Sequence, residues 1–339
     1  MRKNKLKILQ IGLGSMGKRR IRNLLFHEIK ESQIIGFDLA APRRKEMEKL
    51  FPEIKTYGDF NLAMKNESPN VFIISTPPNL HHDYFLFAAK NKINFFCEVP
   101  TNDKGYKELM PKLSNKFVAA PSCTFRYVPA IKKIKELLGN GIIGKPLIFN
   151  HYLGQYLPDW HPYEDYRKVY FAKKETGGAK EMLPYELVWL SHIFKSEPKK
   201  ATGACRKVSD LEMTADDVYS VIVQFENGVL GNMMIDLLNR EAGRTLRIIG
   251  TQGTLDWDWL GYSIRIKQAG VKTAKLINVK KEKKFKHYNT TEDIYREEMK
   301  KFLDAVCGKK KYPYSYKEDY RILKVYGAVE KGNNLKELD

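Results

Sequence analysis

The chain changes from a strand to a helix within the sequence Leu6-Lys7-Ile8-Leu9-Gln10-Ile11-Gly12-Leu13-Gly14-Ser15-Met16-Gly17. Residues 6–11 form a short, mostly apolar run that stops at a glycine, which is typical of a strand buried in a parallel sheet. The three glycines have the spacing GxGxxG. The first permits a tight turn, the second lets the backbone approach a pyrophosphate, and the third lets the helix pack closely on the strand. The sequence therefore predicts a dinucleotide-binding turn between the first strand and the first helix.

Similar apolar runs recur along the first third of the chain, with helix-like stretches between them. They cover residues 33–37, 71–75, 93–97 and 117–119. This alternation predicts an α/β domain with a doubly wound parallel sheet, in which helices cover both faces.

An acidic residue, Asp38, ends the second of these strands. It lies about twenty residues past the last glycine, where a carboxylate binds the adenosine ribose hydroxyls of NAD. Arg43 and Arg44 follow it and could bind the 2′-phosphate of NADP. We therefore expect NAD(H) as the preferred cofactor, with NADP(H) as the alternative.

The pattern changes beyond residue 122. An amphipathic helix is expected over residues 126–139, followed by longer strands whose alternating apolar residues are typical of an antiparallel sheet. The strands cover residues 146–154, 201–208, 218–225, 228–236, 245–249 and 264–267, and a final helix covers residues 292–306. At 339 residues the chain is long enough for two domains. We place a dinucleotide-binding domain at residues 1–122 and a substrate-binding α+β domain at residues 123–339, with the final helix packing back on the body.

The composition is strongly basic, with 59 Lys and Arg against 40 Asp and Glu and a formal net charge of +19. The lysines are scattered, and their one dense run, within residues 280–286, lies in a polar stretch. Because no zinc-finger or aromatic-interleaved pattern accompanies the charge, we expect a solvated surface and no nucleic-acid partner. No segment has the length of a membrane span, so we expect no membrane partner. The four cysteines form no CxxC pair, which indicates neither a zinc site nor a disulfide framework and favours the cytoplasm.

Short motifs extend along nearly the whole chain. They include Ser75-Thr76-Pro77 followed by His81, then Cys97-Glu98-Val99-Pro100, and Gly177-Gly178 before a predicted helix. With the glycine turn, these motifs resemble the glucose-fructose oxidoreductase / inositol dehydrogenase / MocA (Gfo/Idh/MocA) family, whose signatures are TP...H, C-E-K-P and GG...D..HE.D. Residues 11–24 are similar to the opening of its nucleotide-sugar and sialic-acid-related members. Further matches are the loop segments 154–162 and 165–167 and the carboxyl-terminal segments 247–254 and 295–302.

The resemblance implies a Rossmann domain followed by an α+β domain with an open-faced, mainly antiparallel sheet, through which we expect a homodimer or homotetramer. The residues expected to bind the cofactor are Gly12, Gly14, Ser15, Met16, Gly17, Asp38, Thr76, Pro77, His81 and Glu98. For His81, a role as a helix cap is the alternative. The residues expected to bind a sugar or nucleotide-sugar substrate are Arg126, Tyr156, His161, Asp165, Arg167 and Glu181. The alternative for the loop that holds His161, Asp165 and Arg167 is a structure held by internal hydrogen bonds.

The chain departs from the family at the positions that move the substrate proton. Val99 stands where the family has the lysine of the E-K-P turn. Aligned on Gly177-Gly178 and Glu186, the family's aspartate, histidine and second aspartate fall on Met182, Tyr185 and Val188. A register one residue longer would put Glu186 at the histidine position.

We predict that Tyr185 replaces the histidine as the proton donor or acceptor, because a phenol can exchange a proton with an alcohol. Pro184 predicts a helix start just before it, and the helix dipole and nearby Lys180 would then lower the pKa of the phenol. Lys180 is therefore the second candidate catalytic residue, and the alternative for Lys180 and Glu181 is that both face solvent. The alternative is that Tyr185 only packs under the nicotinamide.

Three functions are compatible with these residues. The first is an NAD(P)-dependent oxidoreductase that acts on a hydroxyl or keto group of a sugar or nucleotide-sugar, in either direction. The second is a catalytically degenerate dinucleotide-binding sensor or partner protein of the same fold. The third is a reductase whose substrate needs little help from the protein, as in the biliverdin reductases of this superfamily, and the sugar-type loop argues against it.

Overall fold

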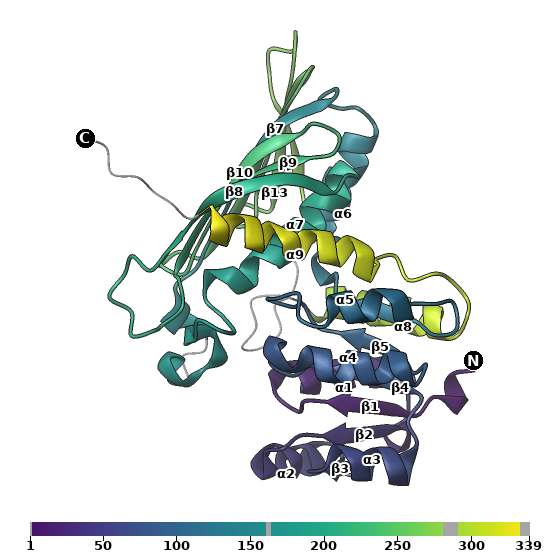
Figure 1. The fold of residues 1–339 in the computed structure, drawn as a ribbon. Helices are drawn as coiled ribbons and strands as arrows, with labels where there is room; N and C mark the ends of the chain where they lie inside the picture. Colours follow the sequence, from purple (N-terminus) through teal and green to yellow (C-terminus); the bar gives the residue numbers. More distant parts are fainter. Residues whose placement is uncertain (1, 161–163, 281–290, 333–339) are drawn as a thin grey trace. The chain divides into compact units, whose positions relative to one another are not determined.

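The computed structural model describes residues 2–160, 164–280 and 291–332, which fall into two compact units (Figure 1). The first unit contains residues 1–124 and 291–320, and the second contains residues 125–290 and 321–339. The first boundary lies close to the expected one at residue 122. The helix over residues 292–306 differs from expectation, because it belongs to the first unit and not to the second.

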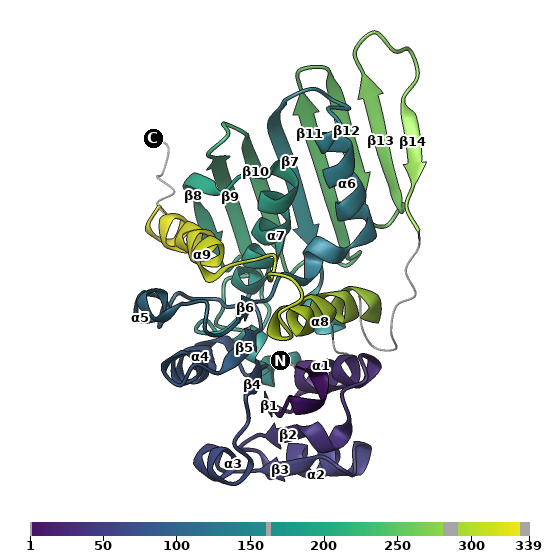
Figure 2. The same cartoon turned by 90° about the vertical axis from the view of Figure 1, so that its right-hand side faces the viewer.

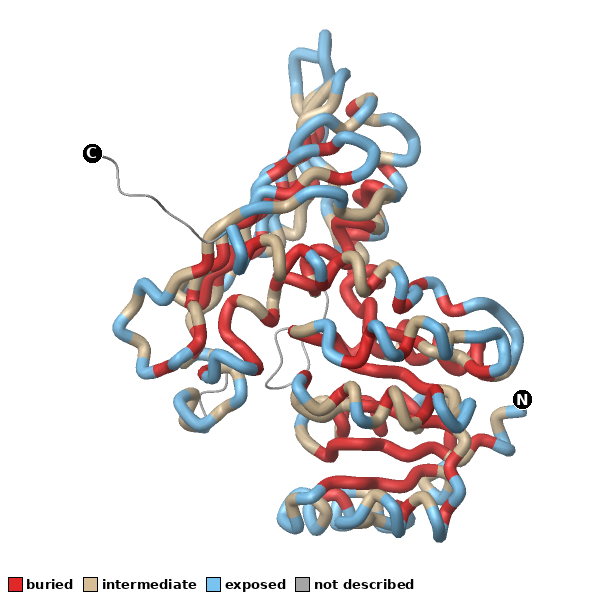
Figure 3. The backbone as a smooth tube through the Cα atoms, in the orientation of Figure 1, coloured by how far each residue is buried: buried red, intermediate tan, exposed pale blue. Residues whose placement is uncertain are grey.

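The first unit is built on the predicted parallel sheet. Its six strands lie in the order β3 (Lys55–Tyr57), β2 (Ile34–Phe37), β1 (Ile8–Ile11), β4 (Val71–Ile74), β5 (Asn94–Cys97) and β6 (Ala119–Pro121). Figure 2 shows the helices α1 (Ser15–Phe26) and α2 (Ala41–Leu50) on one face of this sheet. The helices α3 (Phe60–Glu67), α4 (His81–Lys90) and α5 (Tyr106–Leu109) lie on the other. Every residue of β1, β2 and β4 is buried (Figure 3), which explains why their sequences are apolar apart from Gln10.

A buried ionic network holds the late helix α8 (Glu292–Val306) in the first unit. Arg20 of α1 is fully buried, and its guanidinium lies 2.6 Å from Glu98 Oε1 and 2.8 Å from Glu298 Oε2. Arg19 pairs in the same way with Glu292, at 2.9 Å. Because a buried guanidinium needs a counter-charge, the two acidic residues of α8 fix this helix against α1.

The second unit is an eight-stranded sheet with helices on one face. Its strand order is β14 (Lys275–Asn278), β13 (Ser263–Gln268), β12 (Gly253–Asp258), β11 (Gly243–Gly250), β7 (Pro146–Gly154), β10 (Leu230–Asp236), β9 (Val218–Phe225) and β8 (Pro198–Arg206). All neighbours are antiparallel except β7 and β10. Figure 2 shows α6 (Pro129–Gly139), α7 (Ala179–Phe194) and α9 (Tyr316–Lys331) along one face. No helix in the described part of the chain is long and apolar enough to cross a membrane.

The opposite face of this sheet carries exposed apolar side chains. Among the described residues, no helix covers it. Burial alternates along its strands, so that Ile148 is exposed where Phe149 is buried against the helices. Leu230 pairs with Ile148 across β10 and β7, and Met234 lies on the same face of β10. Ile222 of β9 belongs to the same group, and these four side chains are 41–49% exposed. We call Ile148, Ile222, Leu230 and Met234 the open-face patch.

Candidate active site

The glycine turn after β1 has the geometry that its sequence predicts. Gly12 has a φ of +88°, and a Cβ there would lie 2.6 Å from the carbonyl oxygen of Ser75. A Cβ on Gly17 would lie 2.0 Å from the carbonyl oxygen of Gly12, so only glycine lets α1 come this close to the strand. At Gly14 a Cβ would meet nothing nearer than the Arg43 guanidinium, 4.0 Å away. The turn therefore leaves open space at its second glycine, where α1 begins with Ser15 and Met16 and offers the N–H groups of a first turn.

Asp38 lies beside this turn at the end of β2. Its side chain is buried, one carboxylate oxygen accepts the N–H of Leu13 at 2.9 Å, and the other accepts the N–H of Ala40 at 2.8 Å. An ionised carboxylate has about four acceptor positions, so Asp38 keeps capacity for ribose hydroxyls. Arg43 lies 3.4 Å from Asp38, and Arg44 donates to the main-chain oxygen of Asp38 at 2.7 Å. Both arginines thus contact Asp38 itself.

His81 supports the end of β4. It is buried, and its Nε2 is 2.9 Å from the carbonyl oxygen of Thr76, in the Thr76-Pro77 turn. Burial lowers the pKa of the His81 imidazole to about 4, so the ring is neutral near pH 7 and donates through Nε2. Two buried polar atoms of this turn, Thr76 Oγ1 and His81 Nδ1, have no hydrogen-bond partner within the described structure. Because such atoms are rare in native proteins, they mark where a bound group would add hydrogen bonds.

Glu98, one of the expected cofactor residues, is paired with a buried arginine. Its two carboxylate oxygens accept Nε and Nη2 of Arg20, at 2.6 and 2.8 Å, in a bidentate buried pair. Glu98 is therefore bound first to Arg20 and holds the turn after β5, where Val99 is also buried. The sequence did not predict this pair, because nothing in it shows that an arginine of α1 is buried.

The helix α7 starts earlier than predicted. It begins at Ala179, after Gly178, which has a φ of +81° and on which a Cβ would lie 2.5 Å from the carbonyl oxygen of Asp216. Pro184 therefore lies inside the helix, and the prediction that it opens the helix is wrong. A proline has no N–H for the carbonyl oxygen four residues earlier, that of Lys180. The hydroxyl of Tyr326 donates to this oxygen at 2.6 Å and replaces the missing bond.

Tyr185 follows Pro184 and is half-buried, with its ring 5.8 Å from the ring of Phe125 in an edge-to-face contact. It lies beyond the first turn of α7, where the helix dipole is weak. Lys180 does not act on it as expected, because its ammonium group lies 2.6 Å from a carboxylate oxygen of Glu330. The first-turn position that we expected for Tyr185 is therefore not observed, and Lys180 is paired with a carboxylate.

Glu186 is fully buried and saturated with donors. Arg244 lies 2.8 and 3.0 Å from its two oxygens, and Nε2 of His151 and Nε1 of Trp189 lie 2.9 Å from one of them. Burial by itself would raise the pKa of Glu186, but Arg244 and His151 outweigh it and lower the pKa to about 2. An ionised carboxylate with these partners is a structural group. The longer register, with Glu186 as the proton-transfer residue, is therefore not supported.

Glu181 is a buried acid of a different kind. The hydroxyl of Tyr170 donates to its Oε1 at 2.9 Å, while Oε2 has no partner within the described structure. Burial raises the pKa of the Glu181 carboxyl to about 8 although the Tyr170 hydrogen bond opposes this, so the group is a neutral acid at pH 7. Glu181 and Tyr185 are four residues apart on α7, so they lie on the same face of the helix.

The loop residues expected to bind substrate largely bind one another. The guanidinium of Arg167 lies 2.7 and 3.1 Å from the two carboxylate oxygens of Asp165, and 3.0 Å from Glu212. Asp165 also accepts the main-chain N–H of Arg167 at 3.1 Å. These bonds favour the alternative of a loop held by internal hydrogen bonds, and a substrate role for Asp165 and Arg167 stays a prediction. His161 lies outside the described residues.

The remaining substrate candidates are Arg126 and Tyr156. Arg126 is buried beside α7, and its Nε donates to the carbonyl oxygen of Val188 at 3.3 Å. The Tyr156 ring lies under the guanidinium of Arg240, 3.5 Å from its centre. In the described part of the chain, no group of three or more His, Cys, Asp or Glu residues is placed to hold a metal ion.

Two family models match the chain. The NAD-binding Rossmann fold of the oxidoreductase family matches residues 6–110, and the GFO/IDH/MocA C-terminal domain matches residues 131–256. The chain belongs to the Gfo/Idh/MocA family. It is an oxidoreductase with the NAD-binding Rossmann domain of that family, and the predicted fold class is confirmed.

Curated Gfo/Idh/MocA relatives are distant. The chain is 23% identical to trans-1,2-dihydrobenzene-1,2-diol dehydrogenase of Bos taurus over 62% of this chain, and the match spans 61% of that enzyme's length. It is 24% identical to myo-inositol 2-dehydrogenase of Thermotoga maritima over 74% of each chain.

Solved structures share the whole fold. An oxidoreductase from Agrobacterium radiobacter, in complex with NAD+, L-tartaric acid and magnesium, superposes with a TM-score of 0.83 at 16% identity, over 97% of this chain and 96% of that one. Levoglucosan dehydrogenase in complex with NADH and levoglucosan gives a TM-score of 0.78 at 16% identity, over 97% of both chains. At this identity the likeness establishes the fold alone.

Proposed function

We propose that this protein is an NAD(H)-dependent oxidoreductase of a sugar or nucleotide-sugar, and that Tyr185 moves the proton of the reacting hydroxyl. When bound, the nicotinamide supplies or accepts the hydride. The observation that carries the proposal is the glycine turn with the Asp38 carboxylate fixed beside it. The curated relatives act on rings that carry hydroxyl groups, which supports a polyhydroxylated ring as the substrate.

The first unit has the groups that a dinucleotide needs. The N–H groups of the first turn of α1, with Gly12, Gly14, Ser15, Met16 and Gly17, would hold the pyrophosphate. Thr76 Oγ1 and His81 Nδ1 are unpaired donors or acceptors for the rest of the cofactor. A 2′-phosphate would be repelled by the buried Asp38 carboxylate, which supports NAD over NADP.

The second unit has a phenol and a neutral acid on one helix face. Tyr185 would take the substrate proton during oxidation or return it during reduction. Glu181, one helical turn before it, would donate a hydrogen bond from Oε2 to a substrate oxygen, because it is protonated at neutral pH and Tyr170 already occupies its Oε1. Arg126 donates to the carbonyl oxygen of Val188, about one helical turn after Tyr185, and we propose it as a charged substrate contact.

Calorimetry of cofactor binding tests the proposal. We expect the wild-type protein to bind NAD+ more tightly than NADP+. Asp38→Ala should weaken NAD+ binding by about 1.5–3 kcal/mol, because it removes hydrogen bonds to a charged acceptor. The same change should reduce the preference for NAD+ over NADP+. Glu46→Ala, which removes an exposed acid on α2, is the matched control. Absence of NAD(H) and NADP(H) binding to folded protein would overturn the proposal.

A second function, a dinucleotide-binding sensor without catalysis, is favoured by two observations. Val99 is buried and apolar where related family members have a lysine, and Lys180 is engaged by Glu330. Tight NAD(H) binding without turnover on a panel of keto-sugars and their nucleotide derivatives would select this function over the first.

A further inference from the structure

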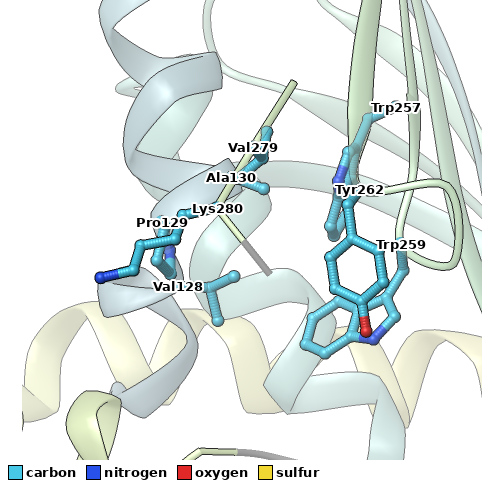
Figure 4. Close-up of a pocket in the computed structure, with 8 residues that line it drawn as sticks. All are labelled: Val128, Pro129, Ala130, Trp257, Trp259, Tyr262, Val279 and Lys280. Carbon is cyan, nitrogen blue, oxygen red and sulfur yellow. The ribbon is translucent and has the colours of Figure 1, made fainter. Parts of the chain in front are cut away.

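The pocket beside the start of α6 is too small for a ligand ring (Figure 4). Val128, Pro129 and Trp259 are among the residues that line it, and its volume is about 30 Å³. That is room for one or two water molecules. Between the described residues that line it, a cofactor or a substrate ring does not fit. A buried polar side chain of the first unit, Gln10, is more closely connected with ligand binding.

Gln10 is a fully buried glutamine in β1. Its Nε2 lies 3.1 Å from the carbonyl oxygen of Gly12, 3.3 Å from that of Ile73 and 3.4 Å from that of Ile11. Because carbonyl oxygens only accept hydrogen bonds, these neighbours decide which end of the amide is the nitrogen. The other end, Oε1, has no hydrogen-bond partner within the described structure. An unpaired buried oxygen destabilises a fold, so stability alone does not explain a glutamine at this position.

An apolar residue would fill the same space. Ile8, Leu9 and Ile11 form the rest of β1 and are fully buried. Methionine is similar in size to glutamine and has no oxygen that needs a partner. What the glutamine adds is therefore its hydrogen bond to the carbonyl oxygen of Gly12, in the glycine turn.

This hydrogen bond connects Gln10 with Asp38 through a single peptide. The carbonyl oxygen of the Gly12–Leu13 peptide accepts Nε2 of Gln10, and the N–H of the same peptide donates to Oδ2 of Asp38 at 2.9 Å. The C=O and N–H bonds of a planar trans peptide point in opposite directions, so Gln10 and Asp38 hold its two sides. Hydrogen bonds in such a chain polarise and strengthen one another. Gln10 therefore helps to fix the Asp38 carboxylate.

We propose that Gln10 is a positioning residue for the dinucleotide, and that it holds the Asp38 carboxylate toward the adenosine ribose through the Gly12–Leu13 peptide. The proposal rests on the function proposed above and deepens its cofactor site. Gln10 is fully buried beneath the turn, so it acts through the peptide and not by contact with the cofactor. Its effect should fall on the ribose, which Asp38 binds, and so on the preference for NAD+ over NADP+.

Calorimetry of Gln10→Met tests this effect. We expect the Kd for NAD+ to rise about tenfold, equivalent to about 1.4 kcal/mol, and the Kd for NADP+ to change much less. A turn that is merely loosened would weaken both cofactors alike, because both place a pyrophosphate there. In an Asp38→Ala background, Gln10→Met should not change the ratio of the two Kd values further. An unchanged ratio in Gln10→Met, or an equal loss for both cofactors, overturns the proposal.

The wild-type protein distinguishes this failure from failure of the proposed function. Absence of NAD(H) and NADP(H) binding to the wild type overturns the function, and the role of Gln10 with it. Binding to the wild type with an unchanged ratio in Gln10→Met overturns the role of Gln10 alone.

A matched control and a cofactor-free measurement complete the test. Nε2 of Gln33 also donates to main-chain carbonyl oxygens, those of Lys3 and Leu6 at 2.9 Å, before β1 and away from the turn. Gln33→Met should therefore keep the cofactor ratio. Hydrogen exchange of the Leu13 amide should be faster in Gln10→Met than in the wild type and unchanged in Gln33→Met, and equal rates in all three overturn the proposal. Gln10→Leu replaces Gln10→Met throughout if the methionine variant does not fold.

Discussion

Two acids on α7 show how surroundings decide what a carboxyl group can do. Glu181 and Glu186 are both buried, but Glu186 has Arg244 and His151 beside it while Glu181 has one phenol. The surroundings of Glu186 keep its carboxyl charged at neutral pH, and those of Glu181 keep its carboxyl protonated. Of the two, only Glu181 can therefore donate a hydrogen bond to a substrate at neutral pH.

The protonation of Glu181 predicts a pH-dependent stability. Its pKa is about 8 in the folded chain and near the ordinary value of 4.5 in the unfolded chain. Between these values the folded state binds more protons, so the free energy of unfolding decreases as the pH rises. Relative to Glu181→Gln, the free energy of unfolding of the wild type should decrease by up to about 1.4 kcal/mol per pH unit between these two pKa values. Urea titrations at pH 5.5 and 7.5 measure the free energy of unfolding at each pH. An identical change with pH in the two proteins would contradict the raised pKa of Glu181.

The role of Tyr185 predicts a kinetic effect that is separate from binding. Tyr185→Phe should reduce kcat by about a hundred- to ten-thousandfold, the usual cost of losing a positioned proton-transfer group, and leave NAD+ affinity unchanged. Tyr84→Phe, which removes another partly buried phenol, is the control. Steady-state rates on a substrate identified in the sugar panel provide the test. A rate that is indifferent to the change removes Tyr185 from the mechanism and leaves it as a packing residue.

At the scale of elements, local sequence predicted the strand, the turn and the start of the helix within residues 6–17 because each step there depends on neighbouring residues. Gly12 and Gly17 are constrained by backbone atoms a few residues away or on the adjacent strand. The start of α7 was predicted incorrectly for the opposite reason. Its continuation through Pro184 depends on Tyr326, a residue far along the chain that no local pattern connects with it.

The hydrogen bond between Tyr326 and Lys180 predicts a coupling between two substitutions. Tyr326→Phe should destabilise the protein by about 1 kcal/mol, because the Lys180 carbonyl loses its donor. In a Pro184→Ala background the restored N–H can bond that carbonyl, so the same substitution should cost less. A double-mutant cycle by chemical denaturation measures the difference. An equal cost in both backgrounds would show that the Tyr326 hydroxyl does not compensate for the proline.

At the scale of the whole molecule, the open-face patch supports our proposal that the protein assembles into a homodimer or homotetramer through this sheet. Exposed apolar side chains gathered on adjacent strands are typical of interaction surfaces. The alternation of apolar and polar residues predicted a sheet with two different faces. The family resemblance predicted that the open face mediates assembly. The assignment of residues 292–306 to the second unit was wrong, because the pairing of Arg19 and Arg20 with Glu292 and Glu298 joins segments from opposite ends of the chain.

A charge within the patch should weaken this assembly. Met234→Lys places an ammonium group among apolar neighbours, and we expect it to shift the protein to monomers at micromolar concentration, measured by light scattering after size exclusion. Leu276→Lys, on the edge strand β14, introduces the same charge at an exposed leucine outside the patch and serves as the control. A wild-type protein that is already monomeric would contradict the proposed assembly.

The two buried arginines of α1 also affect when the first unit can finish folding during translation. Their partners on α8 are translated more than 270 residues later, so a nascent chain that ends before α8 lacks the Glu292 carboxylate that pairs with Arg19 and leaves Arg20 with Glu98 alone. Loss of one partner from a buried ion pair costs about 3–5 kcal/mol. The dinucleotide-binding unit therefore cannot reach its final stability cotranslationally, and a fragment cut at residue 124 should be far less stable than a single polypeptide that joins residues 1–124 to 291–320.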